Sequence, residues 1–175
     1  MKRYSGIVIG WLVLLLAGCG GKQAPQIPSQ RKGQAVKQDV EKEQIMQLNQ
    51  QLAETVGAEL ERWVQAQTEE YALWEVNTWV TVLEAGDTYS ETPKEGEKCV
   101  LTMRIYSFSG ELLAETEQSY RVGKQELPQG VDKNVRRLHK GSKARMVVPW
   151  YSAYGVTGTA DVPPYENVVI EIELK

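Results

Sequence analysis

The fold of this chain is decided by residues 153–175, which read AYGVTGTADVPPYENVVIEIELK. At the end of this stretch, apolar and charged residues alternate, so Ile170, Ile172 and Leu174 share one face and the glutamates between them share the other. A period of two is typical of a strand with one buried face. The glycines and paired prolines before it indicate a loop that leads into this last strand.

Upstream of this stretch, the sequence predicts further strands and one short helix. The strand pattern recurs at residues 79–83, 99–106, 111–117, 120–123 and 144–149. Val131, Val135 and Leu138 recur at i, i+4 and i+7, the spacing of a short amphipathic helix, and Gly141 lies just past its end. Several strands with a single helix predict an α+β domain with an antiparallel sheet.

A long helical spacer is predicted at residues 34–75, ahead of this domain. Proline is absent there, and apolar residues recur about every four positions, at Val36, Val40, Ile45, Leu48, Leu52, Val56, Leu60 and Val64. A helix with one apolar stripe must bury it, either on its own domain or on a second copy of the chain. Both alternatives stay open, and the second would make a homodimer through the helix. The aromatic residues that we expect where helix and domain meet are Trp63, Tyr71, Trp74 and Trp79.

The first 18 residues are typical of an export signal. Lys2 and Arg3 precede an apolar stretch at residues 7–16, which as a helix would span about 15 Å, half of a bilayer core. The stretch is therefore too short for a transmembrane helix. Residues 19–33, which are rich in proline, glycine and glutamine, are expected to form a flexible tether between the signal and the helix.

Cys19 directly follows the apolar stretch, in the sequence LAGC at residues 16–19. This sequence resembles the bacterial lipobox, in which the cysteine thiol receives a diacylglycerol. The resemblance implies a lipoprotein held at the membrane of the cell envelope through Cys19. Gly20, rather than aspartate, follows the cysteine. In a host with two membranes, this implies the outer membrane, with the domain facing the periplasm.

The composition argues against two classes of function. The formal net charge is −3 and no compact cluster of lysine and arginine occurs, so we expect no nucleic-acid partner. One histidine and two cysteines are too few for most metal sites, so we expect no metal. Cys99 lies in a strand-like run, where a buried and inert thiol is expected.

Three stretches of the domain resemble the FKBP-type peptidyl-prolyl cis-trans isomerases. They are PKEGEKCV at residues 93–100, VGKQELPQGV at residues 122–131, and the Ala-Tyr-Gly to Val-Pro-Pro segment at residues 153–164. The resemblance extends over residues 79–175. It implies an FKBP-like antiparallel sheet wrapped on one short helix, and an isomerase of proline-containing polypeptides that assists the folding of exported proteins. It implies no cofactor.

The resemblance also implies a pocket with a tyrosine that anchors the bound peptide. Tyr154 matches this anchoring tyrosine and is the candidate catalytic residue. The positions that match the family's pocket walls are Tyr120, Leu127, Val131, Val162, Leu113, Met103 and Ile170. Tyr154 and Tyr120 also have a simpler interpretation, in which each fills the core with its hydroxyl bonded to the backbone.

Several matched positions depart from the family pattern. Aliphatic or thioether side chains replace aromatic ones at Val131, Met103, Ile170 and Leu113, and Ala114 replaces a carboxylate. Pro128 stands where the family offers a backbone N–H to the ligand, and proline has none. We therefore expect weak or altered isomerase activity. The alternatives are an inactive binding or chaperone module, or a lipid-anchored assembly component.

Overall fold

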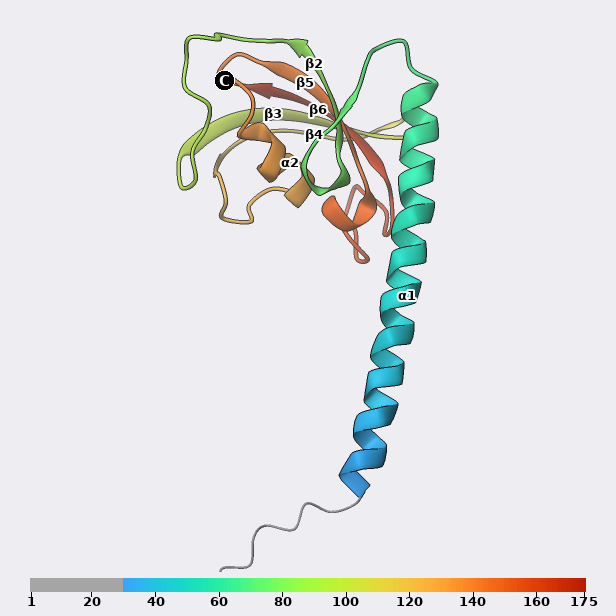
Figure 1. Ribbon diagram of the computed structural model, residues 1–175. Coiled ribbons are helices and arrows are strands. Elements are labelled where there is room, and N and C mark those ends of the chain that lie inside the picture. Colours follow the sequence, from blue (N-terminus) through green and yellow to red (C-terminus); the bar gives the residue numbers. More distant parts are fainter. Residues whose placement is uncertain (1–29) are drawn as a thin grey trace, which may run out of the picture. The chain divides into compact units, whose positions relative to one another are not determined.

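The computed structural model describes residues 30–175, with side chains from residue 40 onward. The predicted signal peptide, Cys19 and most of the predicted tether lie outside the described residues. The chain is divided into two compact units, and the boundary between them lies within the first helix. The second unit, residues 45–175, contains the whole sheet. The elements are α1 (Gln30–Gln65), β1 (Ala72–Leu73), η1 (Glu75–Asn77), β2 (Trp79–Glu84), β3 (Lys98–Ser107), β4 (Leu112–Arg121), α2 (Gln129–Val135), β5 (Lys143–Val148), η2 (Trp150–Ser152) and β6 (Val168–Leu174) (Figure 1).

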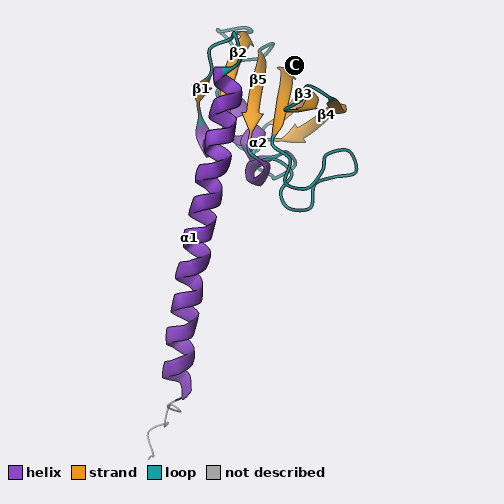
Figure 2. Ribbon diagram, turned by 90° about the vertical axis from the view of Figure 1, so that its right-hand side faces the viewer, coloured by secondary structure: helices purple, strands orange, loops and turns teal. Residues whose placement is uncertain are grey.

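The six strands form one antiparallel sheet in the order β1-β2-β5-β6-β3-β4 (Figure 2). The predicted α+β class and the wrapping of the sheet on one short helix are confirmed. The last strand, β6, lies in the middle of the sheet, where Ile170 pairs with Met146 of β5 and with Ile105 of β3. This central position explains why the inner face of β6 is uniformly apolar.

The main hydrophobic core lies between the sheet and α2. Val131 and Val135, one turn apart on α2, are fully buried against the inward side chains of the strands. The strand residues with less than 2% exposure in this core include Leu101, Met146, Val148 and Ile170. Burying each such side chain contributes about 1.5–3 kcal/mol, so this core holds α2 firmly against the sheet.

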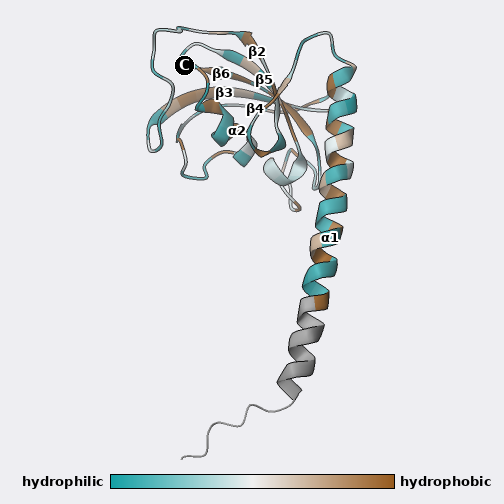
Figure 3. Ribbon diagram, viewed as in Figure 1, coloured by the Kyte–Doolittle hydropathy of each residue, from teal (hydrophilic) through white to brown (hydrophobic). Residues whose placement is uncertain are grey.

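A second hydrophobic cluster joins the C-terminal half of α1 to the opposite face of the sheet. Val56, Leu60 and Val64 are buried there, together with Val147 of β5. The aromatic residues that pack around them are Trp63, Tyr71, Trp79, Phe108, Trp150 and Tyr151. Polar and apolar residues interleave along the coloured part of α1, as this one-sided burial requires (Figure 3).

Three of the four aromatic residues expected at the meeting of helix and domain are therefore found there. Trp74 is the exception, because it packs against the main core instead. The guanidinium carbon of Arg137 lies 4.1 Å from the centre of the Trp74 ring, in a cation–π contact. Trp74 thus belongs to the surroundings of α2 rather than to those of α1.

The predicted bounds of the helical spacer, residues 34–75, are wrong at both ends. α1 begins at Gln30, so Gly33 lies inside the helix rather than in the tether. It ends at Gln65, where the Gln67 side chain donates to the Trp63 carbonyl at 3.0 Å and caps the last turn. Residues 72–73 then pair with β2, with Ala72 opposite Val80, so pairing at the sheet edge replaces the last helical turns.

The two short strands predicted at residues 111–117 and 120–123 are one continuous strand, β4. Strand β4 is at the edge of the sheet and pairs with β3 alone. Its middle residues are mostly exposed, with only Tyr120 buried, which explains the polar sequence that obscured the strand. Within residues 30–175, no helix combines the length and the apolar character needed to cross a membrane.

Candidate functional site

The fold brings the eight residues of the predicted pocket into one contiguous cluster. Six of them are buried members of the main core, namely Met103, Tyr120, Leu127, Val131, Val162 and Ile170. Leu113 and Tyr154 are partly buried and pack against this core, as does Ala114. The cluster draws on β3, β4, α2, β6 and the loop between η2 and β6, so only the folded sheet assembles it.

Tyr154 adds a partly buried polar side chain to this cluster. It lies in the loop after η2, and its ring is partly buried against the core. Burial raises the pKa of the Tyr154 phenol to about 12. Burial alone causes this rise in pKa, and no hydrogen bond from residues 40–175 to the Tyr154 hydroxyl opposes it. Tyr154 can therefore offer an un-ionised O–H to an acceptor brought by a ligand.

The loop that carries Tyr154 is held by backbone hydrogen bonds. The Gly155 N–H donates to the Trp150 carbonyl at 2.8 Å, and the Tyr165 N–H donates to the Gly155 carbonyl at 3.1 Å. Gly158 has a positive φ of 61°, and a side chain there would clash with the Val162 carbonyl. The glycines thus let the loop fold back tightly, and Val162 reaches the core at 1% exposure.

Three of the predicted wall residues form the closed floor of the site. Met103, Val131 and Ile170 are 3%, 0% and 0% exposed. Each stands where the family has a larger aromatic ring, and the smaller side chains are covered by the surrounding core. A bound peptide could not contact Val131 or Ile170 unless the core moved. The partly exposed residues that pack against this core are Trp74, Leu113, Ala114, Ala153 and Tyr154.

Tyr120 is placed differently from Tyr154. Its side chain is 2% exposed, and its hydroxyl is buried without a hydrogen-bond partner among the described residues. Burial raises the pKa of this phenol far above its usual value. The buried position fits the core interpretation of Tyr120, but the expected bond from its hydroxyl to the backbone is missing.

The beginning of α2 shows what Pro128 does at the site. Its carbonyl accepts the N–H groups of Val131 and Asp132, both at 2.9 Å, so Pro128 starts the helix. Asp132 accepts the Gly123 N–H at 2.7 Å and ties the preceding loop to α2. Pro128 thus serves the local fold, while the N–H that the family uses for its ligand is missing at this position.

Two polar residues of β4 beside the cluster were not predicted from the sequence. In the β3–β4 register, Thr116 pairs with Met103 and Gln118 pairs with Leu101, so both point to the face on which α2 lies. Thr116 is partly buried and Gln118 is exposed. The period-two pattern through Ala114 and Tyr120 could have identified them, had β4 been recognised as one strand.

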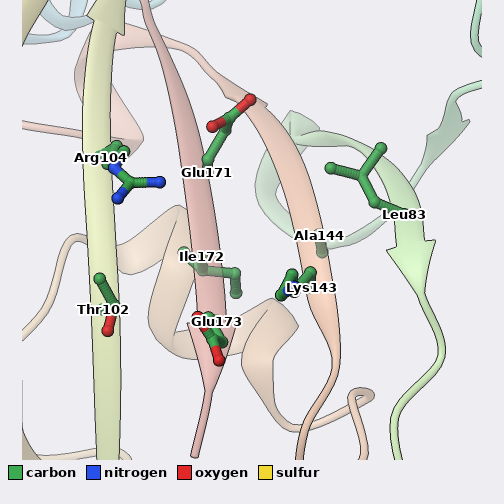
Figure 4. Close-up of a pocket in the computed structure, with 8 residues that line it drawn as sticks. All are labelled: Leu83, Thr102, Arg104, Lys143, Ala144, Glu171, Ile172 and Glu173. Atoms are coloured by element: carbon green, nitrogen blue, oxygen red, sulfur yellow. The ribbon is translucent and has the colours of Figure 1, made fainter.

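The outer face of the sheet carries a separate shallow cavity of about 190 Å³ (Figure 4). Three of its charged side chains form ion pairs with neighbouring residues of the sheet. Arg104 pairs with Glu115 at 2.8 Å, Lys143 pairs with Glu84 at 2.9 Å, and Glu171 accepts two hydrogen bonds from Arg145. Glu173, which also lines the cavity, adds a further carboxylate, and the cavity lies on the opposite face from Tyr154.

Neither a metal site nor a reactive thiol is found among the described residues. Among residues 30–175, no three His, Cys, Asp or Glu side chains are grouped so that they could hold a metal ion. Cys99 is buried, and burial raises the pKa of its thiol, which disfavours the reactive thiolate. What the cluster itself offers a ligand is apolar contact together with the hydroxyl of Tyr154.

Comparisons with known proteins agree with this architecture. Residues 89–175 match the family model described as FKBP-type peptidyl-prolyl cis-trans isomerase. Among solved structures, a peptidyl-prolyl cis-trans isomerase from Pseudomonas syringae pv. tomato is 20% identical with a TM-score of 0.57, and the match covers 70% of this chain and 92% of that one. The N-terminal domain of FKBP42 from Arabidopsis thaliana is 20% identical with a TM-score of 0.55, covering 62% and 91%.

FkpA from Escherichia coli is similar over a longer part of this chain. The match covers 83% of this chain and 69% of FkpA, with 22% identity and a TM-score of 0.58. At these identities the structures establish the fold, whereas the sequence match over residues 89–175 establishes the relationship. The C-terminal domain of this chain therefore belongs to the family of FKBP-type peptidyl-prolyl cis-trans isomerases.

Proposed function

We propose that this chain isomerises X-Pro bonds in exported proteins, with Tyr154 as the anchor of the bound peptide and with weaker activity than is usual in its family. The observation that carries the proposal is the partly buried Tyr154, whose hydroxyl has no hydrogen-bond partner among residues 40–175 and which packs against a large apolar cluster. That combination suits a ligand with apolar surface and a carbonyl group.

The chemistry needs neither a nucleophile nor a metal. Rotation about an X-Pro bond has a barrier of about 20 kcal/mol, because twisting the amide removes its resonance. The twisted amide is less polar than the planar one, so a partly dry, apolar surface favours it. Tyr154, with a pKa of about 12, stays protonated at neutral pH and donates a hydrogen bond to a peptide carbonyl. No proton needs to be transferred.

The expectation of weak activity rests on two missing hydrogen bonds and a closed floor. Pro128 has no N–H, and Ala114 has no carboxylate. Each lost hydrogen bond weakens binding by about 1 kcal/mol, or more where the partner stays buried, so the two together weaken it about tenfold to a few hundredfold. The near-complete burial of Val131 and Ile170 further limits how deeply a proline ring can enter.

The test is a prolyl-peptide isomerisation assay on the wild type, Tyr154→Phe and Tyr89→Phe. Tyr89 is 98% exposed and is the matched control for the loss of a phenol hydroxyl. We expect measurable acceleration by the wild type, a loss of about fivefold to tenfold in Tyr154→Phe, and no change in Tyr89→Phe. Family-typical rates would contradict the proposed weakness, and equal rates in the wild type and Tyr154→Phe would contradict the role of Tyr154.

A binding module without catalysis is the second candidate function. The buried floor residues and Pro128 favour it, because a site with a closed apolar floor can hold a chain without stabilising a twisted amide. In the isomerisation assay, this module would leave the uncatalysed rate unchanged. It would still bind a proline-rich peptide, and Tyr154→Phe would weaken that binding. A fold alone does not decide between these two functions.

Placement in the cell envelope is a separate part of the proposal. The lipobox-like sequence at residues 16–19 supports lipidation of Cys19 and anchoring at a membrane, and the outer membrane in a host that has two. Mass spectrometry of the mature protein tests it, because lipidation adds acyl chains to an N-terminal cysteine. A Cys19→Ser variant that still fractionates with membranes would contradict the anchor.

Dimerisation through α1 is supported by apolar residues that the domain leaves uncovered. Ile45, Leu48 and Leu52 are 57%, 64% and 42% exposed, although they continue the stripe that is buried from Val56 onward. We propose that a second copy covers them, as a lipid-anchored assembly component would require. Sedimentation equilibrium is expected to give a dimer for the wild type and a monomer for Leu48→Glu. A monomeric wild type would refute this part of the proposal.

A further inference from the structure

A hydrogen-bonded bridge connects α1 to the loop that carries Tyr154. Asn167 lies just before β6 and is 8% exposed. Its side-chain nitrogen donates to a carboxylate oxygen of Glu59 in α1 at 3.1 Å, and its side-chain oxygen accepts the backbone N–H of Trp150 at 2.9 Å. Because the amide is planar, the donor and the acceptor are fixed relative to each other, and the position of Trp150 depends on that of α1.

From Trp150 the connection continues to Gly155, the residue that follows Tyr154. The Trp150 carbonyl accepts the Gly155 N–H at 2.8 Å, and so holds the residue that follows Tyr154. The Trp150 and Tyr165 rings are in edge contact with centroids 5.0 Å apart, and the Tyr165 N–H donates to the Gly155 carbonyl. Two hydrogen bonds thus connect Glu59 through Asn167 to Trp150. One turn of backbone, η2, then leads from Trp150 to the loop that carries Tyr154.

Hydrophobic packing fixes α1 at the point where the bridge begins. Val56 and Leu60 flank Glu59 on α1, and both are buried in the cluster that also contains Trp150 and Tyr151. Glu59 itself is exposed, so its hydrogen bond, rather than burial, gives it an influence on Asn167. Packing places the helix, and the bridge transmits this placement to the loop.

We propose that Asn167 is a positioning residue for Tyr154, and that Glu59 makes this positioning dependent on α1. The inference rests on the proposed isomerase function and deepens it. It assigns to the helix ahead of the domain a part in holding the bound peptide. Asn167 and Glu59 act through the loop and do not touch the peptide, so their effect must disappear when Tyr154 has no hydroxyl to position.

The activity test combines bridge variants with the loss of the Tyr154 hydroxyl. We expect Glu59→Ala and Asn167→Ala to lower kcat/KM about threefold to tenfold, the effect of losing one or two hydrogen bonds. Glu59→Gln keeps a side-chain oxygen that can accept from Asn167 and is expected to retain wild-type activity. In the Tyr154→Phe background, Asn167→Ala should cause no further loss. Equal losses with and without the Tyr154 hydroxyl would overturn the proposal.

The matched control is Glu61→Ala on the same helix, because the Glu61 carboxylate accepts from Gln65 one turn later. Glu61→Ala removes the same charge from α1 and leaves the bridge intact. We expect its kcat/KM to equal that of the wild type. A loss as large as that in Glu59→Ala would attribute the effect to the charge of the helix and would overturn the proposal.

Amide hydrogen exchange provides a readout that does not depend on activity. In the full-length protein, we expect the Trp150 and Gly155 amides to exchange at least about fivefold faster in Asn167→Ala and Glu59→Ala, and unchanged in Glu61→Ala. A wild type without isomerase activity would refute the proposed function only. The exchange rates of the Trp150 and Gly155 amides would then still test whether the bridge positions the loop. Faster exchange supports the bridge, whereas unaltered protection of Gly155 overturns it.

Discussion

Trp63 of α1 packs against Phe108 of the β3–β4 turn, with ring centroids 5.4 Å apart, and its indole N–H donates to the Phe108 carbonyl at 3.2 Å. These two residues attach the end of the helix to a hairpin 45 positions away in sequence. We expect Trp63→Ala to lower the free energy of unfolding by about 3 kcal/mol, the usual cost of deleting a large aromatic side chain. Urea denaturation measures this loss.

Trp63→Phe separates the hydrogen bond from the packing at the same position. It keeps an aromatic ring near Phe108 and removes the indole N–H, so we expect a loss of about 1 kcal/mol. If Trp63→Ala and Trp63→Phe were equally destabilised, the hydrogen bond and not the packing would attach the helix. If neither variant lost stability, the second hydrophobic cluster would contribute nothing to the fold.

Gly130 and Gly57 provide a matched pair of helical glycines with opposite expected outcomes. A Cβ at Gly130 would clash with the Val148 side chain and lie 2.9 Å from the Thr78 hydroxyl. We expect Gly130→Ala to destabilise the protein by about 2 kcal/mol through overpacking. Nothing lies within 4 Å of a Cβ at Gly57, so Gly57→Ala should stabilise α1 by about 0.5–1 kcal/mol. Thermal unfolding that ranks the two variants in the reverse order would contradict the packing at α2.

Asn134 fastens η1 to α2 from a fully buried position. Its side-chain nitrogen donates to the Gly130 and Glu75 carbonyls at 2.7 and 3.1 Å, and its oxygen accepts the Glu75 N–H at 3.1 Å. Asn134→Ala leaves the backbone groups of Glu75 without these partners, and we expect a loss of about 3 kcal/mol in chemical denaturation. Gln129→Ala, an exposed change on the same helix, should stay within about 0.5 kcal/mol of the wild type. Equal stability of the two variants would show that the contact with η1 is dispensable.

Features that depend on neighbouring residues in the sequence were predicted well, and features that depend on distant contacts were not. Strand β6 was predicted and is found, because the alternation of Ile170 and Ile172 with glutamates is visible in the sequence of the strand itself. The end of α1 was misplaced, because the pairing of Ala72 with Val80 across the sheet edge ended a pattern that still favoured helix. The edge strand β4 was split, since its solvent-exposed residues carry no hydrophobic signal.

For the candidate site too, the sequence predicted some features and could not predict others. The resemblance identified the residues that the fold brings together, since family motifs mark positions in the chain. It could not indicate that Val131 and Ile170 are closed off by neighbouring side chains, because burial depends on the complete packing. The contact between Glu59 and Asn167 joins residues 108 positions apart, and no local pattern predicts it. The functional roles of the site residues, Tyr154 included, stay predictions.

Tyr120 allows a test of whether its hydroxyl serves the fold at all. The hydroxyl is buried without a hydrogen-bond partner among the described residues, so Tyr120→Phe removes an unsatisfied polar group. We expect Tyr120→Phe to equal the wild type at pH 7 or to exceed its free energy of unfolding by about 1 kcal/mol. A loss of 2 kcal/mol or more, judged against about 1 kcal/mol for a typical hydrogen bond, would reveal a bonding partner of this hydroxyl.

The same variant has a distinct dependence on alkaline pH. Burial raises the pKa of Tyr120 in the folded protein above its ordinary value, which for tyrosine is about 10. Above that pH, the unfolded chain loses the Tyr120 proton while the folded protein keeps it, so the wild type loses stability as the pH rises. Tyr120→Phe lacks this loss, and its advantage over the wild type should grow between about pH 9 and pH 11. Denaturation midpoints at several pH values measure the difference, and a constant gap would mean that the Tyr120 phenol ionises as readily in the folded protein as in the unfolded chain.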